Sequence, residues 1–254
     1  MKTTDVTVDD LRGSVISVPP LARSADGGLC PKNNEKMVRH LEAGGVSTLL
    51  YGGNAALYHV ACSEYEALLS LLAEVASADS WMIPSVGPMY GTMMDQAAIL
   101  KNFPFPTSMI LPTRDAATSV GVGRAVRKFV DACGRPAVLY IKHDGYVDVD
   151  TVSGLMKDGV ISFIKYAVVR ENPTHDPYLQ ELIDSFGPSR IVSGIGEQPA
   201  IDHVHGFGVA GFTSGCVCVA PRLSAAMLRA LQSEDIETAE EIRDPFRPLE
   251  DLRH

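Results

Sequence analysis

The sequence predicts an α/β protein with a (β/α)8 barrel, the TIM-barrel fold. Two observations lead to this prediction. Short apolar segments alternate with helical segments along nearly the whole chain, which is typical of a parallel sheet with right-handed crossovers. The alternation gives eight strand–helix units within 254 residues, a length that fits one barrel. A doubly wound open sheet is the alternative, but no glycine-rich dinucleotide fingerprint follows the first strand.

Eight short segments have the composition of buried parallel strands. They are apolar, rich in β-branched residues and bounded by glycine, proline or polar residues. The predicted strands cover residues 14–18, 46–51, 81–86, 108–111, 137–141, 161–167, 190–193 and 209–214.

Helical periodicity fills the segments between these strands. Ser63 and Glu66 have the spacing of a capping box, so we expect a helix that begins at Ser63. Further helices are predicted over residues 34–43, 93–101, 119–133, 149–156, 177–186, 199–205 and, as one or two helices, 223–242. We expect residues 1–222 to form the barrel domain. Residues 223–254 form a C-terminal helical segment, with the last barrel helix and the start of an extension.

Composition and charge narrow the class of protein. The chain carries 22 lysines and arginines against 31 aspartates and glutamates, a net charge of −9. Nucleic acid and anionic membranes attract clustered positive charge, so we expect neither as a partner. The N-terminus does not have the pattern of a signal peptide, and no apolar run is long enough to cross a membrane. The five cysteines are irregularly spaced, which indicates a reduced, cytoplasmic protein.

The remaining cysteines and histidines do not predict a metal site. Cys216 and Cys218 are expected on one face of an apparent strand, and packed small hydrophobes are the preferred interpretation over metal ligands. The histidines share no ligand spacing with carboxylates, and His203 and His205 are expected near a helix end, in solvent. We therefore expect neither a metal nor another cofactor.

Lys165 is the strongest candidate for a catalytic residue. It lies inside the apolar segment 161–169, and desolvation of an ammonium group is costly unless the group is paired or neutral. A neutral amine is a nucleophile that can form a Schiff base with a carbonyl substrate. The alternatives are that Lys165 reaches solvent from the strand end or pairs with a carboxylate.

Other candidates follow from topology, because the catalytic residues of such barrels lie at the C-terminal ends of the strands. Gly53 and Asn54 follow the second strand, where glycine lets backbone N–H groups approach a ligand. Tyr140 and Lys142 share one face of the fifth strand. If that face is the barrel interior, Tyr140 can transfer protons and Lys142 adds a cation near Lys165. Alternatively, Lys142 leaves the barrel mouth into solvent.

Two further strand ends carry candidates. Arg114 follows the fourth strand and could grip a substrate carboxylate, although an exposed surface position fits equally well. Ser193 and Gly194 end the seventh strand, where small residues leave room for a ligand. Glu197 follows them as a possible acid or base, but an N-cap or first-turn role in the next helix is favoured.

The order of these motifs resembles the dihydrodipicolinate synthase and N-acetylneuraminate lyase family of class I aldolases over essentially the whole chain. Residues 164–167 are similar to the family's Ile-Lys-Glu/Asp-Ala/Ser, whose lysine forms the Schiff base with a 2-oxo acid. Tyr140 stands where the family has the tyrosine of its Tyr-Asn-x-Pro motif. Other matching segments are Pro19-Pro20, Asp26-Gly27, residues 40–46, the carboxylate-binding turn at residues 52–55 and Ser193-Gly194.

The resemblance implies a Schiff base between Lys165 and pyruvate or another 2-oxo acid. It also implies proton transfer by Tyr140, carboxylate binding by Gly53 and Asn54, and a homo-oligomer, either a dimer or a tetramer. Family members usually continue with more C-terminal helices, so we expect a truncated form.

The departures from the family are equally specific. Gly53 and Asn54 replace the synthases' double threonine, and Ile141 and His143 replace the asparagine and proline after the tyrosine. Thr113 and Arg114 replace the strand 4 tyrosine pair, and no residue between Tyr140 and Gly145 corresponds to the arginine with which the synthases grip their second substrate. We therefore expect a lyase or aldolase that acts on another 2-oxo acid, not the lysine-forming synthase. The alternatives are a catalytically silent metabolite- or sugar-acid-binding barrel and a 2-keto-3-deoxy sugar acid dehydratase.

Overall fold

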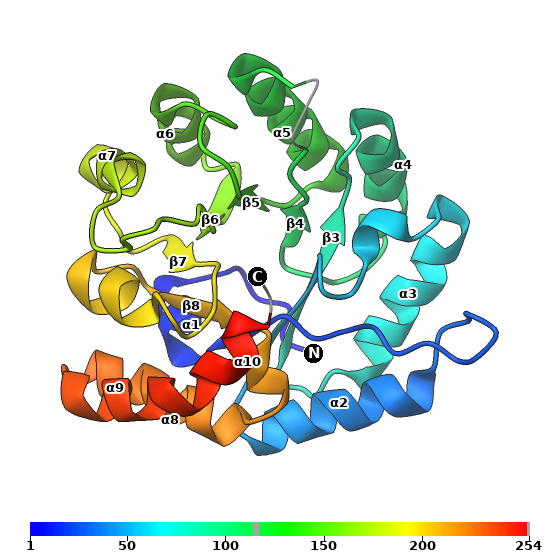
Figure 1. Cartoon of the computed structure of the whole chain (residues 1–254). Helices are drawn as coiled ribbons and strands as arrows, with labels where there is room; N and C mark the ends of the chain where they lie inside the picture. The colour runs from blue at the N-terminus through cyan, green and yellow to red at the C-terminus, as the bar shows by residue number, and fades with distance from the viewer. Residues whose placement is uncertain (114–116, 253–254) are drawn as a thin grey trace.

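The structure is a computed structural model that describes residues 1–113 and 117–252. Within these residues, eight strands form a closed barrel in which each strand pairs with the next and β1 closes the ring on β8. All these pairings are parallel. Figure 1 shows the helices arranged around the outside of the strands. The predicted (β/α)8 barrel is confirmed, and the open sheet is excluded because an open sheet has two free edges.

Every predicted strand is present, although several are shorter than expected. The strands are β1 (Ile16–Ser17), β2 (Thr48–Tyr51), β3 (Trp81–Val86), β4 (Ser108–Ile110), β5 (Ala137–Ile141), β6 (Ile161–Tyr166), β7 (Ile191–Ser193) and β8 (Gly211–Ser214). Each strand residue is buried, which explains why the strands read as continuous apolar runs and not as an alternating pattern.

The helices follow the strands in the expected order. Those that surround the barrel are α2 (Pro31–Ala43), α3 (Cys62–Val75), α4 (Tyr90–Leu100), α5 (Ser119–Cys133), α6 (Val149–Lys157), α7 (Pro177–Phe186) and α8 (Pro221–Gln232), and the others are α1 (Val8–Gly13), α9 (Ile236–Arg243) and α10 (Arg247–Asp251). In α5, Val122, Val126, Phe129 and Cys133 are buried, and their spacing of three or four residues forms the stripe that packs on the strands.

Two local predictions are wrong, and a third element is helical as predicted but of a different helix type. The helix expected from Ser63 begins at Cys62, and its N-cap, Ala61, makes no side-chain cap, because the buried face from Tyr65 onward sets its position. The segment predicted as helical at residues 199–205 is helical, but residues 202–206 form a π-helix, η2 (Asp202–Gly206). Cys216 and Cys218 lie on a 3-10 helix, η3 (Cys216–Cys218), after β8 has ended, not on a strand.

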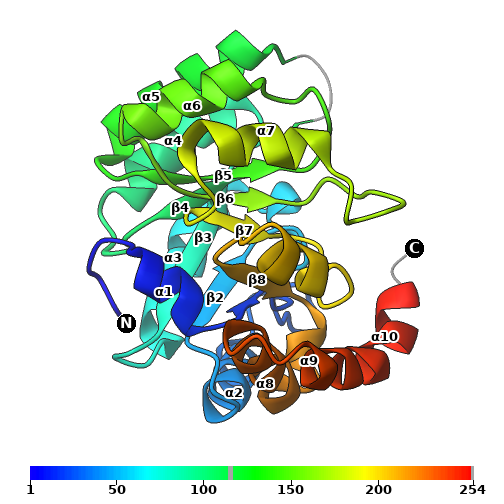
Figure 2. The same ribbon diagram turned by 90° about the vertical axis from the view of Figure 1, so that its left-hand side faces the viewer.

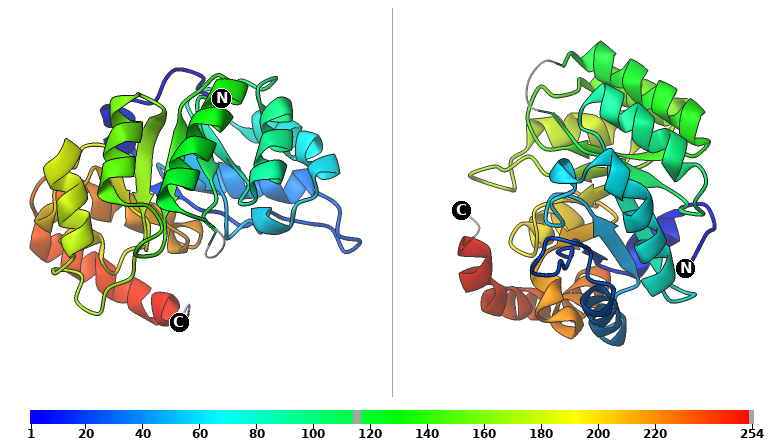
Figure 3. Two further views of the ribbon diagram at one scale, coloured as in Figure 1. Left: turned by 90° about the horizontal axis from the view of Figure 1, so that it is seen from above. Right: turned by 90° about the vertical axis from the view of Figure 1, so that its right-hand side faces the viewer.

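The first and last helices cover opposite ends of the barrel. Figures 2 and 3 show α1 beside the N-terminal ends of the strands and α10 on the side where the strands end. Leu11 of α1 is buried, so α1 helps close the barrel at the N-terminal ends of the strands. None of the helices in the described part of the chain is long and apolar enough to cross a membrane.

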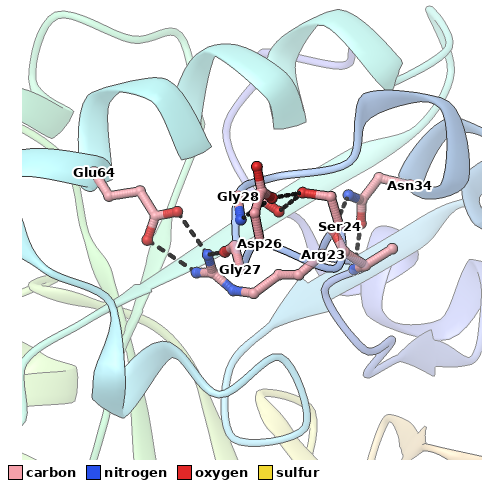
Figure 4. Close-up of polar contacts among 8 residues, drawn as sticks. Arg23, Ser24, Asp26, Gly27, Gly28, Asn34 and Glu64 are labelled. Carbon is pink, nitrogen blue, oxygen red and sulfur yellow. Dashed lines mark hydrogen bonds and ion pairs between the residues drawn. The ribbon is translucent and has the colours of Figure 1, made fainter.

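Polar contacts order the long loop between β1 and α2, which lies at the same end as α10. Arg23 forms a two-point ion pair with Glu64 of α3, at 2.7 and 2.9 Å (Figure 4). Asn34 of α2 is fully buried and exchanges hydrogen bonds with the backbone of Ala22. The loop is therefore held to the helices on both sides of it.

Candidate active site at the C-terminal ends of the strands

Lys165 and Tyr140 are neighbours on adjacent strands. The register of β5 and β6 pairs the two residues, and the Lys165 Nζ lies over the Tyr140 ring, 4.3 Å from its centroid. Both side chains are buried, with 6% and 8% of their surface exposed. Lys165 therefore does not reach out into solvent, and the amine lies against the phenol as the strand alternation requires.

The orientation of Lys165 follows from its neighbour on the strand. The Tyr166 hydroxyl donates a hydrogen bond of 2.7 Å to Asp176, the N-cap of α7, so Tyr166 faces the helix layer. Successive residues of a strand point to opposite sides, and Lys165 consequently faces the barrel interior. Burial and the hydrogen bond to Asp176 both raise the pKa of Tyr166, which keeps its hydroxyl a donor.

A cavity of about 390 Å³ opens at this end of the barrel, within the size range of small-molecule sites. Most of the predicted site residues line it. They are Gly53, Asn54, Tyr140, Lys142, Lys165 and Gly194. Residues that lie far apart in the sequence thus surround one cavity, and Lys165 contributes a buried amine to its wall.

The turn after β2 lies close to the ends of the neighbouring strands. The Asn54 side-chain amide donates to the backbone oxygen of Val18 at 3.1 Å, which ties the turn to β1. Gly52 allows the close packing, because a methyl group there would lie 2.7 Å from Met109 Cε. Gly53 and Asn54 are thereby held at the cavity wall.

The segment after β7 separates the two predicted residues there. Gly194 lines the cavity, and a methyl group on it would lie 3.0 Å from Lys165 Cγ. The Ser193 hydroxyl instead bonds His203 Nδ1 at 2.8 Å and is not among the residues that line the cavity. Gly194 therefore contributes space and backbone, whereas the Ser193 side chain anchors the segment to η2.

The two remaining predicted residues have different outcomes. Lys142 lies one residue beyond the end of β5, is exposed and lines the rim of the cavity. Lys142 was expected either inside the barrel near Lys165 or in solvent at the barrel mouth. Its side chain lies between these two cases, because it borders the cavity and also contacts solvent. Arg114 lies outside the described residues.

The environment of His203 differs from the sequence prediction. His203 is 1% exposed and packs edge-on against Tyr166 and Phe207, so the expectation of a solvated histidine is wrong. Burial lowers its pKa to about 4, because desolvation penalises the imidazolium. The π-helix carries His203 inward, and a helical pattern alone did not reveal that turn. His205 is exposed as expected.

Glu197 is fully buried and does not cap the helix that follows. Its Oε1 accepts hydrogen bonds of 2.6 Å from Ser214 and from Ser224. Its Oε2 is buried and has no hydrogen-bond partner. Burial is the main cause that raises the pKa of this carboxyl group, which favours the neutral acid. The favoured N-cap or first-turn role is therefore wrong.

Glu250 is a site residue that sequence reasoning missed. It belongs to α10, is 4% exposed and lines the cavity together with Lys165. The Cys216 thiol donates to its Oε1 at 2.8 Å. In the sequence, Glu250 lies in a polar stretch without periodicity, so only the position of α10 in space reveals it. The structure also places Cys216 in a specific polar contact, whereas simple packing was expected.

Glu197, Cys216 and Glu250 are the residues best placed to hold a metal ion within the described part of the chain. One ligand atom from each lies within 4.8 Å of the others, and all three side chains are buried. Hydrogen bonds from Ser214 and Ser224 to Glu197, and from the Cys216 thiol to Glu250, already explain why these side chains lie close together. We therefore treat the group as a polar cluster at the cavity wall, which Glu250 lines.

Comparison with solved structures identifies proteins with the same fold as this chain. No family model matches the chain, and no curated protein matches it in sequence. Dihydrodipicolinate synthase from Bacillus clausii superimposes with a TM-score of 0.84 at 23% identity, covering 97% of this chain and 82% of that one. The fold is that of the dihydrodipicolinate synthases. The resemblance seen in the sequence is thus confirmed in the structure, at low identity.

Two other solved structures agree. The dihydrodipicolinate synthase from Oceanobacillus iheyensis gives a TM-score of 0.82 at 21% identity, covering 97% of this chain and 82% of that one. The chloride-inhibited enzyme from Acinetobacter baumannii, complexed with pyruvate, gives 0.81 at 18% identity, with 94% and 82% covered.

Proposed function

We propose that this protein is a class I lyase or aldolase that acts on pyruvate or another 2-oxo acid through a Schiff base on Lys165. The observation that carries the proposal is the buried Lys165 amine, which faces an open cavity beside the Tyr140 phenol. The shared fold with dihydrodipicolinate synthases, one of them in complex with pyruvate, supports the same chemistry.

The first step is imine formation. The neutral Lys165 amine attacks the C2 carbonyl carbon of the 2-oxo acid, and water leaves after proton transfer to the carbonyl oxygen. The resulting iminium carbon accepts an electron pair from the neighbouring bond. Tyr140 lies close enough to the amine to pass protons to and from the oxygen that leaves.

Cleavage of a 4-hydroxy-2-oxo acid then follows from the iminium. A base removes the proton of the C4 hydroxyl, the C3–C4 bond breaks, and an aldehyde leaves while the electron pair forms an enamine on C3. Protonation of C3 and addition of water to the imine release pyruvate and regenerate the amine. A dehydratase would use the same imine but lose a hydroxyl group as water instead of the aldehyde.

The cavity wall supplies groups for the substrate carboxylate. Backbone N–H groups at the Gly53–Asn54 turn and the exposed Lys142 ammonium are suited to bind it. The backbone of Gly194 borders the Lys165 stem. The Ser193 hydroxyl, bonded to His203, positions this segment and does not bind substrate directly.

Reductive trapping tests the proposal. The protein is incubated with pyruvate and cyanoborohydride, and its intact mass is measured. We expect a mass gain equal to pyruvate less one oxygen atom, and we expect none in Lys165→Arg. Lys142→Arg is the matched control and should still trap pyruvate. Binding of 2-oxo acids without any adduct would instead support the catalytically silent barrel.

A further inference from the structure

We propose that Tyr58 is a specificity-determining residue, whose hydroxyl donates a hydrogen bond to the carboxylate of the bound 2-oxo acid. The inference rests on the proposed function and deepens it, because it assigns a side chain that selects acids over neutral carbonyl compounds. Tyr58 lies on η1 (Leu57–His59), a short 3-10 helix that follows the Gly53–Asn54 turn, and it lines the cavity that contains Lys165.

The backbone between the turn and Tyr58 is held in an unfavourable conformation. Ala56 has a φ of +56°, in the left-handed region that disfavours any residue with a β-carbon. The Ala56 N–H donates to the Gly53 oxygen at 2.9 Å, and the Leu57 N–H donates to the Gly52 oxygen at 3.1 Å. Leu57 is also buried in the core. These contacts impose the strained turn, and the turn brings Tyr58 back beside Gly53.

The hydroxyl end of the Tyr58 ring lies against the turn. A methyl group on Gly53 would lie 3.9 Å from Tyr58 Cε2, and Cε2 is bonded to the Cζ atom that carries the hydroxyl. Gly53 itself has no side chain, and the Asn54 amide donates to the backbone oxygen of Val18. The Tyr58 hydroxyl therefore adds a side-chain donor to the backbone N–H groups of the turn.

The chemistry of this hydroxyl suits an anionic acceptor. Burial alone raises the pKa of Tyr58, so the group stays protonated and can donate at neutral pH. The side chain is 37% exposed, which leaves it accessible to a ligand that enters the cavity. A hydroxyl donates a shorter and stronger hydrogen bond to a carboxylate than to a neutral acceptor. Tyr58 is therefore expected to favour a substrate with a negative charge at this wall.

The turn lies across the barrel from the nucleophile. β2 and β6 are four positions apart in the closed ring of eight strands, so the segment that follows β2 is opposite Lys165. A 2-oxo acid joined to Lys165 through C2 carries its carboxylate on C1, which extends from C2 away from the nitrogen. The carboxylate can thus be directed at the opposite wall, where the Tyr58 hydroxyl and the N–H groups of the turn lie.

A matched ligand pair tests the inference. The probes are pyruvate and pyruvamide, which have the same shape and differ in a charged carboxylate or a neutral amide. Their dissociation constants are measured by calorimetry on the full chain. We expect Tyr58→Phe to raise the constant of pyruvate about tenfold, the usual effect of losing a hydrogen bond to a charged group. The constant of pyruvamide should rise less than about threefold, because its amide oxygen is a weaker acceptor.

Two controls separate this role from a structural or a proton-transferring one. Tyr90→Phe removes the same hydroxyl from an exposed tyrosine of α4, which lines a different cavity, and should leave both constants unchanged. At saturating pyruvate, Tyr58→Phe should trap the imine within about threefold of the wild-type rate, because Tyr58 binds the carboxylate and not the reacting carbon. An equal rise of both dissociation constants in Tyr58→Phe would indicate a general loss of packing and would overturn the role.

The two proposals fail in different ways. Unchanged pyruvate affinity in Tyr58→Phe, with pyruvate still trapped on Lys165, overturns the role of Tyr58 and leaves the proposed function intact. A wild type that binds pyruvate without forming an adduct overturns the proposed function, while the ligand pair still tests Tyr58. A wild type that binds neither ligand overturns both.

Discussion

Gly194 packs directly on the stem of Lys165, so closely that a methyl group on the glycine would lie 3.0 Å from Lys165 Cγ. The same methyl group would lie 2.8 Å from Ala167 Cβ and 2.9 Å from the Tyr166 backbone oxygen. The end of β7 therefore fixes the position of the Lys165 side chain. Any larger residue at position 194 would also force Ala167 Cβ and the Tyr166 backbone oxygen to move.

Gly194→Ala should therefore disable imine formation while leaving the protein folded. Overpacking of this kind costs about 1–3 kcal/mol, and displacement of Lys165 should slow pyruvate trapping at least roughly tenfold. Gly91→Ala is the matched control, because a methyl group at Gly91 meets nothing within 4 Å. It should trap pyruvate at the wild-type rate. Equal trapping rates in both variants would contradict the close-packing account.

Tyr140→Phe separates the ring of Tyr140 from its hydroxyl group. The ring under the Lys165 Nζ is kept, so the imine with pyruvate should still be trapped, although more slowly, because Tyr140 passes protons while the imine forms. Turnover of a cleavable 2-oxo acid should fall by roughly 10²–10⁴, the usual contribution of one acid or base. Tyr140→Leu should lower trapping as well. Wild-type turnover in Tyr140→Phe would show that another group transfers the proton.

Arg170 pairs with two carboxylates in different surroundings. Asp176 is fully buried and also accepts the Tyr166 hydroxyl, whereas the Asp144 side chain is 57% exposed. Asp176→Ala should destabilise the protein by roughly 3–5 kcal/mol, because it leaves a cation and a hydroxyl without their buried partner. Asp144→Ala should cost less than about 1 kcal/mol. Urea unfolding of both variants checks this, and similar losses would contradict it.

His203 makes folding stability sensitive to acid. Its pKa falls from 6.5 in the unfolded chain to about 4 in the folded protein, so between these values the unfolded chain binds more protons. Stability is therefore complete above pH 6.5 and is lost as the pH falls toward 4, by up to about 3 kcal/mol. His203→Gln should flatten this part of the pH profile in urea unfolding.

The comparison of His203→Gln with wild type isolates the histidine from other groups. The raised pKa of Glu197 acts with the opposite sign, because the folded protein then binds the extra proton and loses stability as the pH rises through that pKa. This contribution is present in both proteins and cancels in the difference. A variant with an unchanged acid-induced loss of stability would rule out His203 as its source.

The barrel and its central lysine could be predicted because both depend on local pattern. The buried strands are continuous apolar runs, and Lys165 interrupts one of them. Strand alternation then placed Tyr140 on the same face, which the register confirms. Gly53, Asn54 and Gly194 followed from the general rule that parallel strands end at one rim.

The parts that could not be predicted depend on contacts between distant segments. Glu197 is buried because Ser214 and Ser224, from β8 and α8, satisfy one of its oxygens. His203 turns inward on a π-helix that a helical pattern does not distinguish. Glu250 reaches the cavity only because α8 and α9 place α10 at the end of the barrel where the strands stop. Ser63 has the spacing of a capping box, but packing of the helix set its first residue.

The most direct measurement is to locate the reduced pyruvate adduct by peptide mass spectrometry. The central claim is that the Lys165 amine, and not the exposed Lys142 amine at the rim, attacks the 2-oxo acid. We predict a fragment series with the modification on Lys165 and unmodified Lys142, lost in Lys165→Arg. An adduct on Lys142 alone, or none with pyruvate and a panel of longer 2-oxo acids, would contradict the account.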